Sequence, residues 1–256
     1  MERIDFQSWM PGAFDGKPFG PRDLEALEEE AGVGRCVVMP EAEDRPDNDG
    51  LAARIRGRSR MVGCAAVIPR LGEEAVEELE RAVLGLGFRG LRLFPAEHGY
   101  PVDGGEVDPV LEKARELAVP VTVDGCRENC EPARVAAAAS RFPEVPFIVD
   151  VGFRPSAPPA SMQVPLPPEG RIAEAARETP NLYLGLTAMA AVELYCIKRL
   201  MGVCGPEKLI FGSNAPRGLP RLAVRGFEMV RLPRQQEEAV LGGTLAALYG
   251  ISGEEG

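Results

Sequence analysis

The sequence predicts one α/β domain folded as a (β/α)₈ barrel. Short apolar runs, typical of buried parallel strands, alternate with longer helical patterns along the whole chain. Eight such runs are present, and 256 residues is a usual length for one barrel of this kind. We expect the domain to span residues 1–256, with a doubly wound open sheet as the alternative architecture.

The eight predicted strands are short and rich in β-branched or leucine side chains. Such composition is typical of strands that are buried on both faces. In chain order they span residues 3–6, 35–39, 62–68, 90–94, 119–124, 146–151, 182–186 and 208–212.

The predicted helices lie between these strands. The clearest spans 73–86, where Val76, Leu79, Val83 and Leu86 recur at three- and four-residue steps. The others span 22–31, 49–56, 109–117, 131–141, 169–178 and 192–201, followed by a helical region at 233–249. The glutamate run at 28–30 is expected on a solvated helix face.

The proline-rich segment 153–168 follows the sixth predicted strand. In a barrel it therefore leaves from the C-terminal face, where active sites lie. We expect it to be either a lid over the site or a surface excursion.

The charge balance excludes some classes of partner. Lys and Arg number 29 and Asp and Glu number 39, which gives a net charge of −10. This argues against nucleic-acid binding and against a basic membrane-surface protein. No apolar run reaches the roughly 20 residues of a membrane span. With six scattered cysteines, no CxxC pair and a charged N-terminus, we expect a cytoplasmic protein.

Acidic side chains close two neighbouring predicted strands. Asp124 follows Pro-Val-Thr-Val, and Asp150 follows Phe-Ile-Val. A carboxylate directly after buried apolar residues is costly unless it is hydrated, paired or metal-bound. We therefore expect a functional site, the alternative being that each acid caps the next helix. The other side chains expected at the same barrel mouth are Gln7, Trp9, Arg92, Phe94 and Asn214.

Six segments in this order resemble the amidohydrolase superfamily, in its branch of decarboxylases, hydratases and lactonases. They are residues 4–9, 63–69, 87–95, 120–125, 147–152 and 208–216. The resemblance covers the chain from end to end. It implies a TIM barrel that hydrolyses, hydrates or decarboxylates a small anionic compound, and it leaves a homodimer open.

The chain departs from this family at its metal-binding and catalytic positions. Gln7 and Trp9 stand in place of the two histidines of the Ile-Asp-x-His-x-His motif. Asp124 and Asp150 replace the histidines after strands five and six, and Asn214 replaces the catalytic aspartate. Zinc is therefore a less expected cofactor, because it prefers imidazole and thiolate ligands.

One interpretation of the altered site is an enzyme that uses a hard cation. Gln7, Asp124, Asp150 and Asn214 offer oxygen ligands, which suit Mg²⁺, Mn²⁺ or Ca²⁺. Trp9 argues against this interpretation, because a large indole takes one ligand position.

A second interpretation is a hydrolase without metal that binds its anionic substrate through arginines. Asp124 or Asp150 would be the general base, and Asn214 would orient water or donate to an oxyanion. The arginines that could bind a carboxylate are Arg92, Arg127, Arg154 and Arg217.

A third interpretation is a non-catalytic barrel that binds a small anion or a partner subunit. The replacement of two histidines by paired acids, rather than by inert residues, argues against it.

Three further residues lie in loops at the mouth. The only histidine, His98, follows the fourth strand and is either a substrate-binding or acid–base group or a solvated loop residue. Cys126 and Cys130 follow the fifth strand, where a soft-metal site is an alternative to idle thiols.

Overall fold

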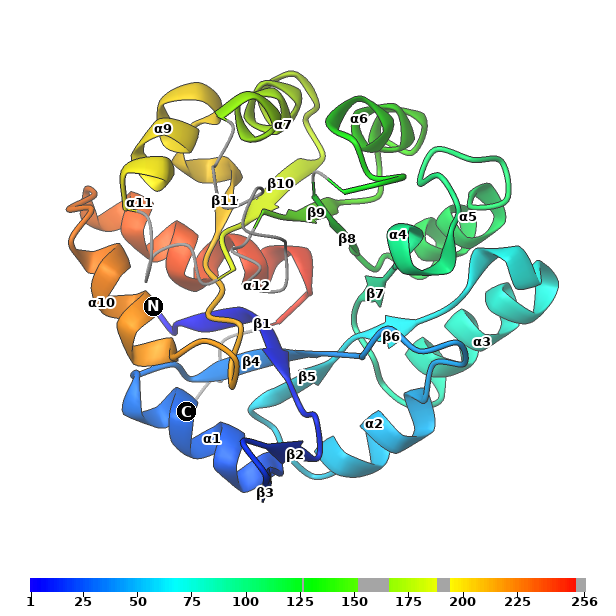
Figure 1. Cartoon of the computed structure of the whole chain (residues 1–256), viewed down its shortest axis with the longest axis horizontal. Coiled ribbons are helices and arrows are strands. Elements are labelled where there is room, and N and C mark those ends of the chain that lie inside the picture. Colours follow the sequence, from blue (N-terminus) through cyan, green and yellow to red (C-terminus); the bar gives the residue numbers. More distant parts are fainter. Residues whose placement is uncertain (126, 152–165, 188–193, 252–256) are drawn as a thin grey trace.

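Eight parallel strand positions form the barrel in the computed structural model, which describes residues 1–125, 127–151, 166–187 and 194–251 (Figure 1). Two hydrogen-bonded sheets, ordered β1-β4-β5 and β11-β10-β9-β8-β7-β6, make up its wall. The strands are β1 (Ile4–Trp9), β4 (Arg35–Met39), β5 (Met61–Gly63), β6 (Ala65–Ala66), β7 (Leu91–Arg92), β8 (Val121–Asp124), β9 (Phe147–Asp150), β10 (Leu182–Gly185) and β11 (Leu209–Ile210).

The two sheets join at both seams. Between β5 and β6, the Cys64 amide donates to the Val38 carbonyl at 3.1 Å, and the Ala65 amide donates to the Gly90 carbonyl at 2.8 Å. The third barrel strand therefore pairs with β4 through its first half, β5, and with β7 through its second half, β6. At the other seam the Phe6 amide donates to the Phe211 carbonyl at 3.0 Å. The barrel predicted from the sequence is thus confirmed.

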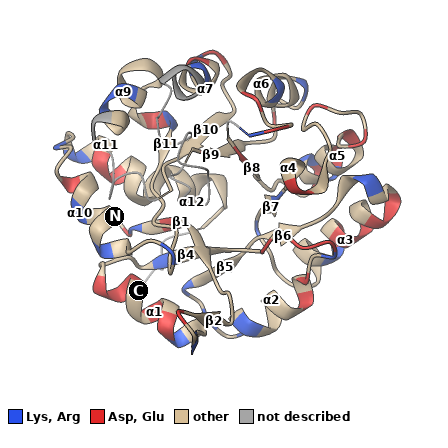
Figure 2. Cartoon of the chain, in the orientation of Figure 1, with Lys and Arg blue, Asp and Glu red and all other residues tan. Residues whose placement is uncertain are grey.

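The helices form an outer ring around the strands, except the last one, α12, which lies near the middle of the barrel in Figure 1. Charged residues lie mostly on the helices of the ring (Figure 2). Their bounds are α1 (Pro21–Glu30), α2 (Asn48–Ile55), α3 (Glu73–Leu84), α5 (Asp108–Glu116), α6 (Pro132–Arg141), α7 (Leu166–Glu178), α9 (Leu194–Cys204), α10 (Pro220–Glu228), α11 (Arg234–Glu238) and α12 (Thr244–Leu248).

Short elements complete the described structure. The turn of helix α4 (Pro95–His98) follows β7, and β2 (Ala13–Phe14) pairs with β3 (Lys17–Pro18) after β1. Single turns occupy Pro69–Leu71 and Pro206–Lys208, and a π-helical turn, Ala239–Gly243, joins α11 to α12.

The sequence did not predict α10 or the β2–β3 hairpin. Proline at the first position of α10 suits a helix start, and Ala223, Val224 and Phe227 form its buried face.

The hydrophobic core has two parts. A large cluster fills the space between the strands and the outer helices. A smaller cluster lies inside the barrel, where Ile4, Phe6 and Ile148 pack with Leu245 and Tyr249. The helical region 233–249 therefore helps to fill the barrel. No helix in the described ranges is both long enough and apolar enough to cross a membrane.

Candidate active site

The two predicted strand-end acids lie side by side. Asp124 ends β8 and Asp150 ends β9, and the two residues are direct partners in the parallel pairing of these strands. Both side chains are buried, with about 1% of Asp124 and 2% of Asp150 exposed. The structure therefore places two carboxylates next to each other at the C-terminal mouth of the barrel.

Arg92 lies between these acids and is itself buried. It belongs to β7, the neighbour of β8, and its Nη2 forms an ion pair with Asp124 and lies 3.8 Å from Oδ2 of Asp150. Its guanidinium is also 5.3 Å from the centre of the Phe94 ring. Within the described residues, its Nε and Nη1 have no hydrogen-bond partner. Arg92 is thus a fixed positive charge between two strand-end carboxylates, and its Nε and Nη1 remain able to donate hydrogen bonds.

Arg127 adds a second positive charge to the same group. Its Nη1 donates to Oδ2 of Asp124 at 2.8 Å and pairs with Glu97 of α4. Although partial burial opposes it, these two hydrogen bonds raise the pKa of Arg127 above its ordinary value. About 35% of its side chain is exposed, so Arg127 is the cation of this group that solvent reaches.

Trp9, Asn214 and Arg217 form a second group at the mouth. The indole Nε1 of Trp9 donates to Oδ1 of Asn214 at 2.7 Å. The Arg217 guanidinium lies over the Trp9 ring, 4.7 Å from its centre, and donates to both oxygens of Glu41 at 2.8 and 3.0 Å. Asn214 has φ +66°, a left-handed conformation that asparagine tolerates better than most residues.

Gln7 lies on β1, two residues before Trp9, and is buried. Its Oε1 accepts from the hydroxyl of Thr187, which lies two residues after the end of β10, at 3.1 Å. Its backbone carbonyl accepts from the Asn214 amide at 3.0 Å. The side-chain carbonyl that the sequence offers as a metal ligand therefore has a partner within the chain.

The residues present do not fit a divalent cation. The Oδ1 of Asn214 accepts from Trp9, the Oε1 of Gln7 accepts from Thr187, and Asp124 accepts from two guanidiniums. No group of three or more His, Cys, Asp or Glu in the described ranges is arranged to hold a metal ion. A cation placed between Asp124 and Asp150 would also meet the positive charge of Arg92.

His98 is held in place by its neighbours. Its Nε2 lies 3.0 Å from the Glu43 carbonyl, and its ring stacks against Tyr100 at 6.4 Å and meets the edge of Phe94 at 5.9 Å. It therefore links the loop after β4 to the loop after β7 instead of pointing freely into solvent.

The cysteine of this region that the structure describes is an inert thiol. Cys130 is buried, and burial raises its pKa to about 12. Cys126 and Arg154 lie outside the described residues, as does most of the proline-rich segment, of which only 166–168 fall within α7.

Sequence reasoning missed a buried carboxyl pair beneath the mouth. The Oδ1 of Asp5 accepts from the amides of Gln7 and Ser213 at 3.0 and 2.9 Å. Glu28 of α1 accepts from the Ser8 hydroxyl at 2.9 Å and lies close enough to Asp5 for the two charges to interact. Burial raises the pKa of Asp5 to about 6, and burial together with the Asp5 charge raises the pKa of Glu28 well above its ordinary value.

The expectation of a solvated face at 28–30 is therefore wrong for Glu28, which is 2% exposed. Its helix turns this residue toward β1, while Glu29 and Glu30 remain exposed. The signal available in the sequence was Asp5, an acid inside the apolar run of the first strand.

Comparison with solved structures identifies the same fold elsewhere. A 5-carboxyvanillate decarboxylase from Sphingomonas paucimobilis is 14% identical, covers 98% of this chain and 99% of its own, and has a TM-score of 0.75. A 2,6-dihydroxybenzoate decarboxylase from Rhizobium is 15% identical, with 99% and 100% covered and a TM-score of 0.75. A dihydroxybenzoic acid decarboxylase from Polaromonas, solved with manganese and 2-nitroresorcinol, is 15% identical, with 99% and 98% covered and a TM-score of 0.73.

Comparison of the sequence with models of protein families shows to which family the chain belongs. A search of curated proteins found no match. The family model described as Amidohydrolase, by contrast, matches residues 3–251, nearly the whole chain. The prediction of a hydrolase or lyase family is thereby confirmed at the level of the family, and the chain belongs to the amidohydrolase family.

Proposed function

We propose that this chain is a hydrolase or lyase that acts on a small anionic compound at the C-terminal mouth of the barrel without a metal ion. The observation that supports this most directly is the position of Arg92 between Asp124 and Asp150. The family resemblance places metal-binding histidines where these two acids stand. In this chain a guanidinium supplies the positive charge at that place.

The chemistry that Arg92 provides is electrostatic. A charge that is already fixed in a buried site can stabilise negative charge that develops on a substrate, with little reorganisation. Arg127 lies beside it and is partly exposed, so an incoming carboxylate meets Arg127 first. Arg217, which stacks on Trp9, is the second arginine that can contact the substrate from the rim.

We assign the general base to Asp150. Each oxygen of Asp124 accepts from one arginine, so Asp124 holds Arg92 and Arg127 in position. Asp150 closes the neighbouring strand at the same level and would take a proton from water or from the substrate. The Asn214 side chain accepts from Trp9 through its oxygen, which leaves its amide N–H groups to orient water or an oxyanion.

Aromatic carboxylates are the first substrates to test. Proteins of the same fold are named for decarboxylation of 5-carboxyvanillate and 2,6-dihydroxybenzoate, both of which are aromatic carboxylates. Lactones of dicarboxylic acids are the second class, since an arginine-lined site can bind their free carboxylate.

The test is turnover by protein treated with a chelator and then passed through a desalting column. We expect decarboxylation or lactone hydrolysis to survive this treatment, Asp150→Asn to abolish it, and Arg127→Gln to raise KM. Asp108→Asn is the matched control, because Asp108 pairs with Arg141 on the outer helices. Activity that appears only after Mn²⁺ or Zn²⁺ is added would contradict the proposal.

A second candidate function is binding without turnover. Gln7 and Asn214 stand at two of the family's functional positions. The observation that favours binding alone is that the side-chain oxygens of both residues already accept hydrogen bonds from within the chain. A compound that raises the melting temperature but is recovered unchanged after prolonged incubation, with no other compound turned over, would support this candidate instead.

The homodimer and the cytoplasmic location remain predictions from the sequence. Light scattering coupled to size-exclusion chromatography measures the first, and cell fractionation measures the second.

A further inference from the structure

A large cleft lies at the end of the barrel opposite the candidate active site. It is bounded by residues at the start of β4 and β5, by the loop that leads from α2 into β5, and by the loop that leads from α3 toward β7. Its volume is about 1130 Å³. Since Asp124 and Asp150 lie at the opposite ends of their strands, a ligand here would not reach the mouth.

The cleft is basic although the protein is acidic. Among the described residues, its lining includes four arginines and no aspartate, glutamate or lysine, in a chain whose net charge is −10. An anion in this cleft would meet a local positive field without a facing carboxylate among these lining residues. The arginines are Arg35, Arg56, Arg58 and Arg89.

These arginines differ in how far other groups neutralise them. Arg58 forms an ion pair with Glu25 at 2.8 Å, and Arg35 lies 3.6 Å from Glu2. Arg89 is exposed and donates to the Gly250 carbonyl at 2.7 Å, and it forms no ion pair with a residue that the structure describes. Arg56 is exposed and has no ion pair with any described residue.

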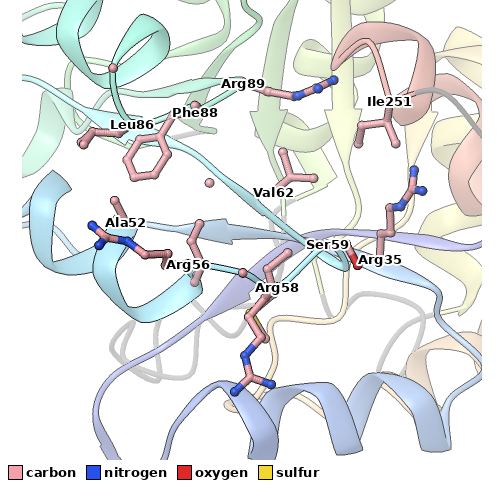
Figure 3. A pocket seen from close by; sticks show the side chains of 16 residues that line it. Arg35, Ala52, Arg56, Arg58, Ser59, Val62, Leu86, Phe88, Arg89 and Ile251 are labelled. Atoms are coloured by element: carbon pink, nitrogen blue, oxygen red, sulfur yellow. The ribbon is translucent and has the colours of Figure 1, made fainter.

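The floor of the cleft is apolar. Figure 3 shows Leu86, Phe88 and Ala52 toward one end and Ile251 toward the other, with Val62 between the two ends. Gly63 makes this floor compact, because a Cβ there would lie 2.3 Å from the Phe88 ring. An apolar surface beside arginines is suited to a ligand that has an apolar body and an anionic group.

We propose that this cleft binds an organic anion with an aromatic or aliphatic body, such as an aryl carboxylate. The body packs on Val62, Leu86 and Phe88. The carboxylate lies toward Arg89 and Arg35, whose side chains both extend toward Ile251 in Figure 3. Arg56 lies at the other end and adds attraction at longer range. The proposal concerns a second site and does not depend on the function proposed for the mouth.

The test uses 2-naphthoate as the probe and 2-naphthamide as its neutral counterpart of nearly equal size. In titration calorimetry we expect the folded protein to bind naphthoate and to bind the amide at least about tenfold more weakly. Raising the salt concentration should weaken naphthoate binding, because an exposed charge contact is screened. In amide NMR spectra, the shifts of Gly63 and Gly87 should move.

Arginine variants locate the site. Arg89→Gln should weaken naphthoate binding about tenfold and Arg56→Gln about threefold, while Arg115→Gln on the outer face of α5 should leave it unchanged. Arg56 makes no ion pair within the described ranges, so its variant should fold even if Arg89→Gln does not. Arg127→Gln, at the mouth, is the control for binding at the other end.

Three results would overturn the proposal. The first is no binding of naphthoate at millimolar concentration. The second is that Arg89→Gln and Arg56→Gln both bind naphthoate as tightly as the wild type. The third is affinity that falls in Arg127→Gln but not in the two cleft variants, because that result would place the probe at the mouth. None of these results bears on whether the mouth is catalytic, which the turnover assay measures separately.

Discussion

Arg92 and Asp124 form an ion pair inside the barrel, with about 1% of each side chain exposed. Asp150 lies 3.8 Å from the same guanidinium, so one buried cation serves two buried carboxylates. Burial of charges is costly unless they are paired, and each member of such a group depends on the others. Arg92, Asp124 and Asp150 are therefore part of the proposed site, and we also expect them to be needed for the stability of the barrel mouth.

Removal of Arg92 should destabilise the protein strongly. Arg92→Met leaves Asp124 and Asp150 without their shared cation, and we expect a loss of about 3–5 kcal/mol in the free energy of unfolding. Urea denaturation followed by circular dichroism measures it. Arg134→Gln, which breaks a surface pair with Asp103, should cost less than about 1 kcal/mol. Equal, small losses in the two variants would show that Arg92 is not needed to compensate the acids.

Because Asp5 and Glu28 are buried together, we expect the free energy of unfolding to fall as pH rises. Because the pKa of Asp5 is raised to about 6 in the fold, the folded protein favours the protonated form. The stabilisation from that proton is present below about pH 4 and is lost as pH rises toward 6, and titration of Glu28 extends the loss further. Thermal unfolding measured from pH 4 to pH 8 tests this direction.

Glu28→Gln isolates this effect. The amide keeps a polar partner for Ser8 and can donate to Asp5 without a proton that titrates, so we expect the fall in melting temperature to become shallower. Glu29→Gln, on the exposed next position of the same helix, is the matched control and should leave the pH profile unchanged. Identical profiles for the two variants would remove the carboxyl pair from the explanation.

The Trp9–Asn214 hydrogen bond makes the only tryptophan a reporter of the mouth. Asn214→Gly suits the left-handed backbone but leaves the buried indole N–H unpaired, at an expected cost of about 1–3 kcal/mol. Asn214→Asp keeps an acceptor at that position and should cost less. Urea unfolding followed by Trp9 fluorescence compares the two. A Gly variant as stable as the Asp variant would mean that the bond contributes little.

The sequence predicted the barrel well because its signals are local. Each strand is a short buried apolar run, and the acids that end β8 and β9 stand out against those runs. The helix α10 was missed because Gly226 and the preceding proline resemble turn signals, and its amphipathic face is recognised only once Phe227 is seen buried.

The site was predicted in part. Their positions at or near the C-terminal ends of the predicted strands indicated that Arg92, Asp124 and Asp150 lie at the same mouth, but not that the guanidinium lies between the acids instead of pointing toward a substrate. That depends on side-chain conformation and on the register of β7, β8 and β9, which a single sequence does not specify. The Asp5–Glu28 pair joins β1 to α1, a contact between residues 23 positions apart that periodicity alone cannot indicate.

We infer that Arg92 supplies the positive charge that a metal would otherwise supply between Asp124 and Asp150. Elemental analysis of protein purified without a histidine tag, alongside a thermal shift assay with added Mn²⁺, Mg²⁺, Ca²⁺ and Zn²⁺, tests this role of Arg92 most directly. We expect well below one equivalent of any of these metals and no rise in melting temperature. One equivalent of a divalent metal, bound in the wild type and lost in an Asp124→Asn, Asp150→Asn double variant, would show instead that a metal supplies this charge.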